Sequence, residues 1–164
     1  MSKQELLYKG LEDWLSRKLV LWGITELTDV QEKAVSVGAA SGKSLIVSAP
    51  TSSGKTLIAE IAMLAALRQG LKVTYLVSHR ALADQKFLDF SERIGERAKE
   101  PLARVALSTG DRTEGNVDAE VCVATYEKAI GLLLTGQIRP GNSLVIADEL
   151  QILCDPSRLS LDIQ

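Results

Sequence analysis

A glycine, a lysine and a hydroxyl side chain follow one another at Gly54, Lys55 and Thr56, at the end of a run of small residues. The full run is Ala49-Pro50-Thr51-Ser52-Ser53-Gly54-Lys55-Thr56. Small residues let a backbone curl around a phosphate and present its N–H groups, and a helix that begins there adds the positive end of its dipole. Lys55 can then reach the β- and γ-phosphates of ATP, and the Thr56 hydroxyl can ligate Mg²⁺. The run therefore predicts a phosphate-binding loop, although its first position is Ala49 instead of the usual glycine.

A second triplet of this kind, Gly42-Lys43-Ser44, comes before an apolar run instead of after one. Val37 stands where the first glycine of a phosphate loop would be. We therefore predict an ordinary loop with a solvated lysine at this place.

Two carboxylates, Asp148 and Glu149, directly follow the apolar run 144–147. Asp148 would hold Mg²⁺ through its water shell, because Mg²⁺ prefers oxygen ligands and keeps several waters. Glu149 would orient and deprotonate an attacking water. Alone, the pair also fits an acidic turn after a strand, and its place after the phosphate loop favours an ATPase site. Lys55, Asp148 and Glu149 are thus the predicted catalytic residues, with Thr56 and Asp148 as metal ligands.

Short apolar runs alternate with helix-length segments after Gly23. The predicted strands are Leu45–Ser48, Val73–Val77, Val105–Leu107, Val121–Ala124 and Leu144–Ala147, and the predicted helices are Thr56–Arg68, Ala81–Arg97 and Tyr126–Leu134. Strands without polar alternation are typical of a parallel sheet buried on both faces. The alternation predicts an α/β fold with a mostly parallel, doubly wound sheet and helices on both faces. Ligands of such sheets bind at the carboxyl ends of the strands, where the motifs fall.

The N-terminal segment has leucines and a tryptophan at helical spacing, after a possible capping box at Ser2 and Glu5. We predict an amphipathic helix over residues 1–22 that packs on an ATP-binding lobe formed by residues 23–164.

Composition limits the class of protein. The 164 residues suit one ordinary domain, and 46% apolar with 24% charged residues is typical of a soluble globular chain. The net charge of −2 shows no overall basic character, so any contact with nucleic acid must be local.

We expect Cys122 and Cys154 to be reduced core thiols, and one histidine, His79, is too few for a zinc cluster. No targeting or membrane-spanning run stands out, and we expect a cytoplasmic or nucleoid-associated protein, nuclear in a eukaryote.

The order of these motifs resembles superfamily-two helicases of the DEAD/DExH type, most closely the Ski-like branch with its archaeal DNA-helicase relatives. The resemblance extends from Gly23 to Arg158 and implies a RecA-like fold, the first of the two lobes of such a motor. Gly23-Ile24-x-x-Leu27-x-x-x-Gln31 is similar to the upstream Q motif. The resemblance implies that Gln31 reads adenine, because an amide can both donate and accept.

Three further segments resemble the motifs that line a groove for one strand of DNA or RNA in this family. They are His79-Arg80-Ala81-Leu82-Ala83-Asp84-Gln85-Lys86, Ser108-Thr109-Gly110-Asp111 and Ala124-Thr125-Tyr126-Glu127-Lys128. The resemblance implies that Arg80, Thr109, Gly110 and Thr125 contact nucleic acid, mostly at its phosphates. Arg80 offers a forked cation, while hydroxyls and backbone N–H groups offer neutral donors.

The sequence departs from the family pattern in two ways. Gln151 stands where the acidic motif usually ends in His or Asp, and the chain stops at Gln164, before the Ser-Ala-Thr motif and the second lobe. In the family the second lobe carries an arginine finger worth about 10³–10⁵ in rate. We therefore expect a fragment of a longer protein, which would bind ATP, hydrolyse little of it and unwind nothing without its second lobe.

Two alternatives remain at the level of sequence. A small P-loop kinase would respond to a metabolite and not to nucleic acid, but an Asp-Glu strand end suits water activation and no arginine-rich lid is present. A nucleotide-sensing or scaffold module would bind ATP without turnover, which Gln151 and the short chain both allow. Single-turnover ATP cleavage by the full-length protein distinguishes the scaffold from the helicase.

Overall fold

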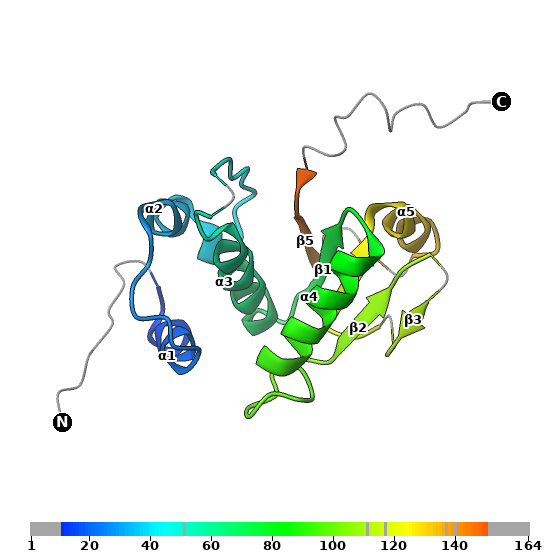
Figure 1. Ribbon diagram of the computed structural model, residues 1–164, viewed down its shortest axis with the longest axis horizontal. Coiled ribbons are helices and arrows are strands. Elements are labelled where there is room, and N and C mark those ends of the chain that lie inside the picture. The colour runs from blue at the N-terminus through cyan, green and yellow to red at the C-terminus, as the bar shows by residue number, and fades with distance from the viewer. Residues whose placement is uncertain are drawn as a thin grey trace. The chain divides into compact units, whose positions relative to one another are not determined.

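The computed structural model describes residues 11–150, apart from residues 51, 111, 117, 137 and 140. Two compact units make up the chain, Met1–Leu71 and Lys72–Gln164. Their helices and strands are labelled in Figure 1. Thr51, Gln151 and Cys154 lie outside the described residues, as does the predicted helical segment before residue 11.

The first unit contains helices. They are α1 (Asp13–Leu21), α2 (Asp29–Val37), the 3₁₀ turn η1 (Ala39–Ser41) and α3 (Lys55–Arg68). Helix α1 buries Leu15 and Leu19, and the Arg68 guanidinium of α3 lies 5.4 Å from the centre of the Trp14 ring. A second apolar cluster joins Ala34 of α2, Ala39 of η1 and Ile58 of α3. The predicted helix over residues 1–22 is wrong at its described start, because Glu12 has an extended conformation and α1 begins only at Asp13. Leu15 and Leu19, in the described part of the apolar stripe, are buried as the helical spacing predicts.

The predicted strand Leu45–Ser48 is wrong for the described structure, because this segment pairs with no described strand. Val47 packs against the cluster around Ile58, but Ile46 is 91% exposed. An apolar run shows that a segment can be buried, whereas a strand exists only where a neighbour supplies hydrogen bonds.

In its described residues, the second unit is a five-stranded sheet with two helices. In chain order its elements are β1 (Lys72–Val77), α4 (Arg80–Arg93), β2 (Val105–Ser108), β3 (Thr113–Glu114), β4 (Val121–Thr125), α5 (Tyr126–Leu134) and β5 (Ser143–Ala147). The strand order is β3-β2-β4-β1-β5, and every pair is parallel except β2 with β3. The predicted mostly parallel sheet is therefore confirmed, and β3, which has only two residues, is a strand that the sequence did not predict.

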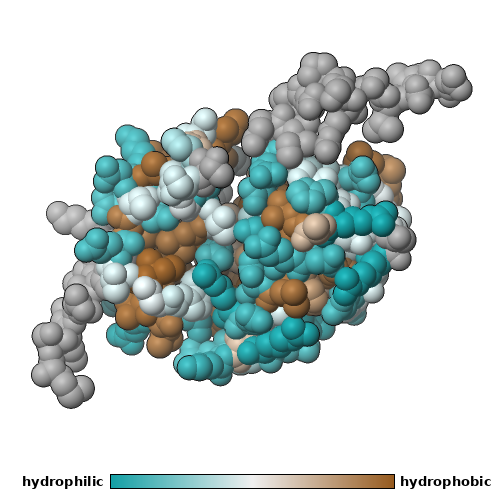
Figure 2. Space-filling model, viewed as in Figure 1, coloured by the Kyte–Doolittle hydropathy of each residue, from teal (hydrophilic) through white to brown (hydrophobic). Residues whose placement is uncertain are grey.

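Helices cover both faces of this sheet. Tyr75 and Leu76 are consecutive in β1, so their side chains point to opposite faces. The Tyr75 ring meets Phe90 of α4 edge to face, with 5.1 Å between the ring centres, whereas Leu76 packs against the cluster that contains Leu132 of α5. In the view of Figure 1 the strands lie behind α4, and Figure 2 shows that the outer side of this helix is mostly hydrophilic.

Burial differs between the central and edge strands. All of β4 is buried, whereas β5 has neighbours on one side only among the described strands and leaves Val145 51% exposed. Burial raises the pKa of the Cys122 thiol in β4 to about 11, as expected for an inert core cysteine. No helix in the described part of the chain is long and apolar enough to cross a bilayer.

Helix α4 ends at Arg93 instead of the predicted Arg97. The N–H groups of Ile94 and Gly95 both donate to the Phe90 carbonyl, at 2.9 Å, and close the helix. A Cβ atom at Gly95 would lie 2.7 Å from the Ser91 backbone, so this tight turn needs a glycine.

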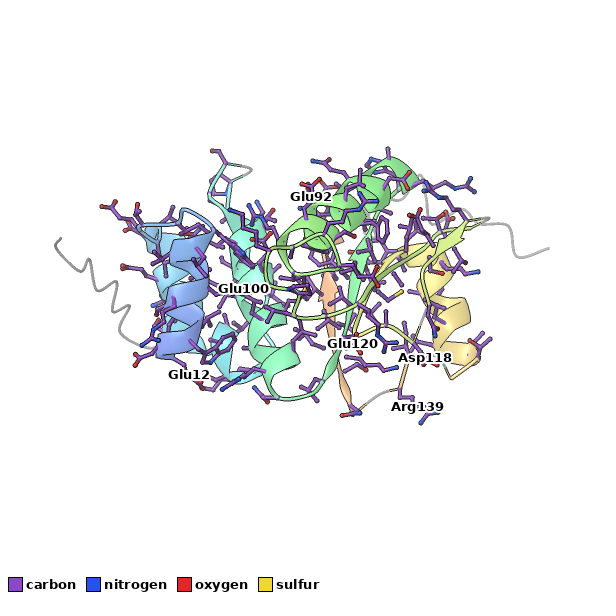
Figure 3. All side chains as sticks on the ribbon, turned by 90° about the horizontal axis from the view of Figure 1, so that it is seen from below. Glu12, Glu92, Glu100, Asp118, Glu120 and Arg139 are labelled. Atoms are coloured by element: carbon purple, nitrogen blue, oxygen red, sulfur yellow. The ribbon has the colours of Figure 1, made fainter. Side chains whose placement is uncertain are left out.

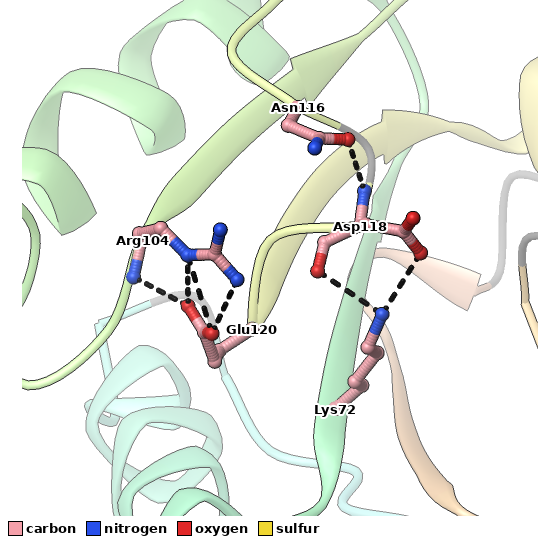
Figure 4. Close-up of polar contacts among 5 residues, drawn as sticks. All are labelled: Lys72, Arg104, Asn116, Asp118 and Glu120. Atoms are coloured by element: carbon pink, nitrogen blue, oxygen red, sulfur yellow. Dashed lines mark hydrogen bonds and ion pairs between the residues drawn. The ribbon is translucent and has the colours of Figure 1, made fainter.

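Ion pairs tie together the chain at the amino ends of the strands (Figure 4). Arg104, just before β2, binds Glu120 with its guanidinium at 2.7 Å and with its backbone N–H at 2.8 Å. Lys72 at the start of β1 pairs with Asp118 at 3.0 Å, and Arg139 lies near Asp118 in Figure 3. These pairs lie at the opposite edge from the predicted motifs and hold the strand starts in register.

Candidate functional site

The predicted phosphate loop ends at Gly54, whose φ of 79° is a left-handed conformation that favours glycine. Helix α3 begins at the next residue, Lys55. The Lys55 ammonium donates to the carbonyls of Ala49 and Pro50, at 2.5 and 3.0 Å, and the Ser53 hydroxyl also donates to Pro50, at 2.7 Å. The loop thus curls around the lysine, next to the N-terminus of a long helix. Anion binding there needs the ammonium to exchange carbonyl oxygens for phosphate oxygens.

Gln31 is bonded to this loop. Its amide nitrogen donates to the Gly54 carbonyl at 3.0 Å, and its amide oxygen accepts the Thr28 N–H at 2.8 Å as part of the α2 capping box. The Thr28 hydroxyl donates to the Ser53 carbonyl at 3.2 Å. Gln31 is only 5% exposed. One N–H and one lone pair of its amide remain for adenine, so adenine recognition stays a prediction.

The second triplet is a loop, as predicted. Gly42 ends η1 and Lys43 is exposed, with its stem against Gly38.

Asp148 is fixed by three hydrogen bonds in the second unit. Its N–H donates to the Leu76 carbonyl at 2.9 Å, which extends the pairing of β5 with β1. Its carboxylate oxygen Oδ2 accepts from the Tyr75 hydroxyl at 2.8 Å, and its backbone carbonyl accepts from the Tyr126 hydroxyl at 2.7 Å. Both the side chain and the backbone of this residue are therefore held in place.

Glu149 is in the left-handed region, with a φ of 55°, and no other non-glycine residue in the described ranges has a positive φ. This conformation is unfavourable for a side chain with a Cβ atom and is found preferentially at functional sites. The carboxylate is exposed and accepts a long hydrogen bond of 3.4 Å from the Ser78 hydroxyl. The chain therefore turns sharply after Asp148 and leaves the Glu149 carboxylate accessible to water.

Tyr126 remains a hydrogen-bond donor over the physiological pH range. Burial, and then the charges of Asp148 and Glu149, raise its pKa to about 12. Neighbouring carboxylates disfavour the phenolate form, so the proton that bridges Tyr126 and Asp148 stays on the tyrosine.

The predicted nucleic-acid residues all end or follow strands of the sheet: Arg80 begins α4 after β1, Thr109 and Gly110 follow β2, and Thr125 is the last residue of β4. Arg80 is exposed, and a Cβ atom on Gly110 would lie 2.9 Å from its guanidinium, so the two residues are in contact. Thr109 is buried and its N–H donates to the Arg112 carbonyl at 2.9 Å, which forms the turn into β3. The Thr125 hydroxyl is buried without a hydrogen-bond partner among the described residues.

Lys55 belongs to the first unit and Asp148 to the second, so their convergence on one metal ion stays a prediction. The family assignment does not depend on it. Residues 28–160 match the DEAD/DEAH box helicase family. The chain belongs to that family.

Curated relatives agree with the DEAD/DEAH box assignment. The chain is 39% identical over 140 residues to "ATP-dependent DNA helicase Hel308" of Methanocella arvoryzae, which covers 83% of this chain and 19% of the relative. A protein of the same name from Aeropyrum pernix is 38% identical over 142 residues, with 84% and 18% covered. The chain thus spans about a fifth of the length of these relatives. The predicted family, a superfamily-two helicase of the Ski-like branch, is confirmed.

A solved structure supports the DEAD/DEAH box fold. A crystal structure of a hypothetical ATP-dependent RNA helicase from Sulfolobus tokodaii superposes with a TM-score of 0.67 and 22% identity, over 91% of this chain and 44% of that one. At this identity the likeness concerns the fold, and the predicted RecA-like α/β class is confirmed. The matched family is one of helicases, which disfavours the metabolite-kinase alternative.

Sequence reasoning missed the two tyrosines, Tyr75 and Tyr126, that hold Asp148. Tyr75 lies between apolar residues and Thr74 in β1, and a buried tyrosine hydroxyl needs a polar partner. That rule predicts a partner for Tyr75, but only the pairing of β1 with β5 shows that the partner is Asp148.

Proposed function

We propose that this chain supplies the ATP- and Mg²⁺-binding residues, and part of the single-strand groove, of an ATP-dependent helicase or translocase. The observation that carries the proposal is the adjacency of β1 and β5. The carboxylates of Asp148 and Glu149 follow β5, and the segment that leads to Arg80 follows β1. The residues proposed for ATP cleavage and for nucleic-acid contact therefore follow neighbouring strands at the same edge of one sheet.

The donor atoms suit Mg²⁺. Nucleotide-bound Mg²⁺ takes one or two protein oxygen ligands and completes its shell with phosphates and water. The half-buried carboxylate of Asp148 and the exposed hydroxyl of Thr56 are oxygen donors of this kind. When bound, Mg²⁺ would neutralise negative charge on the β- and γ-phosphates.

The protein's own groups would carry out the remaining steps. Lys55 would release the Ala49 and Pro50 carbonyls and bind phosphate oxygens instead. Glu149 would orient a water in line with the γ-phosphorus and accept its proton as the oxygen–phosphorus bond forms. The bond from the γ-phosphorus to the bridging oxygen then breaks, which gives ADP and inorganic phosphate. Catalysis of this type consists mainly of positioning and charge stabilisation.

The nucleic-acid partner would be a single strand held by its phosphates. Arg80 is the exposed cation of the site, and Gly110 lets the backbone approach it closely. Phosphate contacts carry position and little sequence information, so these residues suit a motor that moves along any sequence. The relatives named above are called DNA helicases, so we propose single-stranded DNA as the first track to test. The second RecA-like lobe would come from the same, longer protein.

ATP hydrolysis by the full-length protein tests this proposal, with single-stranded DNA, single-stranded RNA or neither. We expect stimulation by a nucleic acid, and we expect Glu149→Gln to bind ATP but lose most turnover. Hydrolysis that is indifferent to both nucleic acids, or unchanged in Glu149→Gln, would refute it. ATP binding without any turnover would instead favour the scaffold alternative.

A further inference from the structure

The side chain of Tyr75 is fixed by packing before it reaches Asp148. It is 1% exposed, and its ring lies edge-on to Phe90 of α4. The ammonium of Lys86, also on α4 and only 8% exposed, lies 5.8 Å from the ring centre, within the range of a cation–π contact. Two contacts from α4 hold this ring, and its hydroxyl is directed to Oδ2 of Asp148.

The hydrogen bond from Tyr75 divides the carboxylate into two different oxygens. Oδ2 accepts the tyrosine proton at 2.8 Å, whereas Oδ1 makes no hydrogen bond with the part of the chain that the structure describes. A donor on one oxygen orients the plane of a metal-binding carboxylate, and such outer partners affect metal affinity strongly. Oδ1 is then the oxygen available to Mg²⁺ or to its water shell.

The backbone of Asp148 is fixed independently of Tyr75. Its N–H is bonded to Leu76 and its carbonyl to Tyr126, so the Cα position survives the loss of the Tyr75 hydroxyl. Among the described residues, only the Tyr75 hydroxyl is hydrogen-bonded to the side chain of Asp148. Removal of the Tyr75 hydroxyl should therefore release the carboxylate and leave the turn in place.

We propose that Tyr75 is a positioning residue that orients the Asp148 carboxylate for Mg²⁺, with its ring held by Lys86 and Phe90 of α4. The proposal rests on the role of Asp148 in the function proposed above. It assigns no direct contact between Tyr75 and the metal, the nucleotide or the reacting water.

The test is Tyr75→Phe in the full-length protein, which keeps the ring and its packing and removes only the hydroxyl. Mn²⁺, a paramagnetic substitute for Mg²⁺, is titrated in the presence of a non-hydrolysable ATP analogue and followed by electron paramagnetic resonance. We expect Tyr75→Phe to weaken Mn²⁺ binding by about tenfold, the lower end of the effects seen for outer partners of metal ligands. Binding of the analogue in EDTA should not change, and excess Mg²⁺ should restore most of kcat.

Thr74→Val is the matched control. Thr74 is the neighbouring buried hydroxyl of β1 and points to the opposite face of the sheet. This variant should bind Mn²⁺ like the wild type, whatever it does to the melting temperature. Wild-type Mn²⁺ affinity in Tyr75→Phe, or an equal loss in Thr74→Val, would overturn the proposal.

Asp148→Ala separates the inference from the function on which it rests. If Asp148→Ala loses Mn²⁺ binding and Tyr75→Phe does not, the positioning role is wrong and the metal site stands. If Asp148→Ala binds Mn²⁺ like the wild type, the metal role proposed for Asp148 is itself wrong.

Discussion

The hydroxyl of Tyr75 lies 2.8 Å from the Asp148 carboxylate, although the two residues are 73 positions apart in the sequence. The bond joins the middle of β1 to the turn after β5. It exists because these strands pair in parallel with Leu76 opposite Ala147, which places Asp148 one residue beyond the paired part of β5. A side chain in the core thus supports a carboxylate at the edge where ligands of parallel sheets bind.

Lys55→Ala should lower ATP affinity by about 100-fold or more, or about 2.7 kcal/mol, because the loop loses the cation for the β- and γ-phosphates. Isothermal titration calorimetry measures the change. Lys43→Ala is the matched control, since Lys43 belongs to the other Gly-Lys-Ser triplet and is exposed. Equal losses in both variants, or none in Lys55→Ala, would remove the assignment of the phosphate loop.

Arg80→Ala should weaken binding of single-stranded DNA and reduce the slope of log K against log salt by about 0.7, the contribution of one phosphate on a single strand. Fluorescence anisotropy at several salt concentrations gives the slope. Arg104→Ala removes an arginine from the opposite edge of the sheet and should leave the slope unchanged. An unaltered slope in Arg80→Ala places that residue outside the groove.

Sequence patterns predicted the elements of this chain that form through interactions between residues close together in the sequence. The run at 121–124 is apolar and β-branched, and it forms the buried centre of the sheet. The phosphate loop follows from the spacing of Gly54, Lys55 and the helix after them. Both depend on residues that are near one another in the chain.

The parts that sequence missed depend on pairing between distant segments. Tyr75 and Tyr126 hold Asp148 only because β1 lies beside β5 and α5 follows the adjacent strand β4. The same limit explains the wrong strand at 45–48, where apolar residues indicated burial but could not specify a partner strand. Family resemblance predicted that Gln31 reads adenine, but only the structure shows its hydrogen bond to the Gly54 carbonyl.

Acid should weaken the ion pair that Glu120 forms with Arg104. The hydrogen bonds from Arg104 lower the pKa of Glu120 to about 2, so the pair contributes its full stability above the ordinary glutamate pKa of 4.5 and loses it as the pH falls toward 2. The carboxylate is 40% exposed, so solvent screening limits the contribution to less than about 1 kcal/mol. Between pH 5 and 2 the unfolding free energy of the wild type should therefore fall more than that of Glu120→Gln, which urea denaturation measures. Parallel curves for the two proteins would contradict the assignment.

Gly110→Ala should affect nucleic-acid binding without much effect on stability. Its new methyl group would lie 2.9 Å from the terminal nitrogen of Arg80, the flexible end of a long side chain, so the guanidinium can move away at little cost to the fold. The displaced guanidinium should then bind single-stranded DNA more weakly, by up to the loss seen in Arg80→Ala.

Gly131→Ala is the control, because its methyl group meets no atom within 4 Å and it replaces a glycine inside α5. That variant should raise the unfolding free energy by about 0.5–1 kcal/mol and leave DNA affinity unchanged. If Gly110→Ala binds DNA as tightly as the wild type, the contact between Gly110 and Arg80 has no part in the groove. The double variant Arg80→Ala/Gly110→Ala tests how the glycine acts. If it binds DNA no more weakly than Arg80→Ala alone, the glycine acts through the arginine.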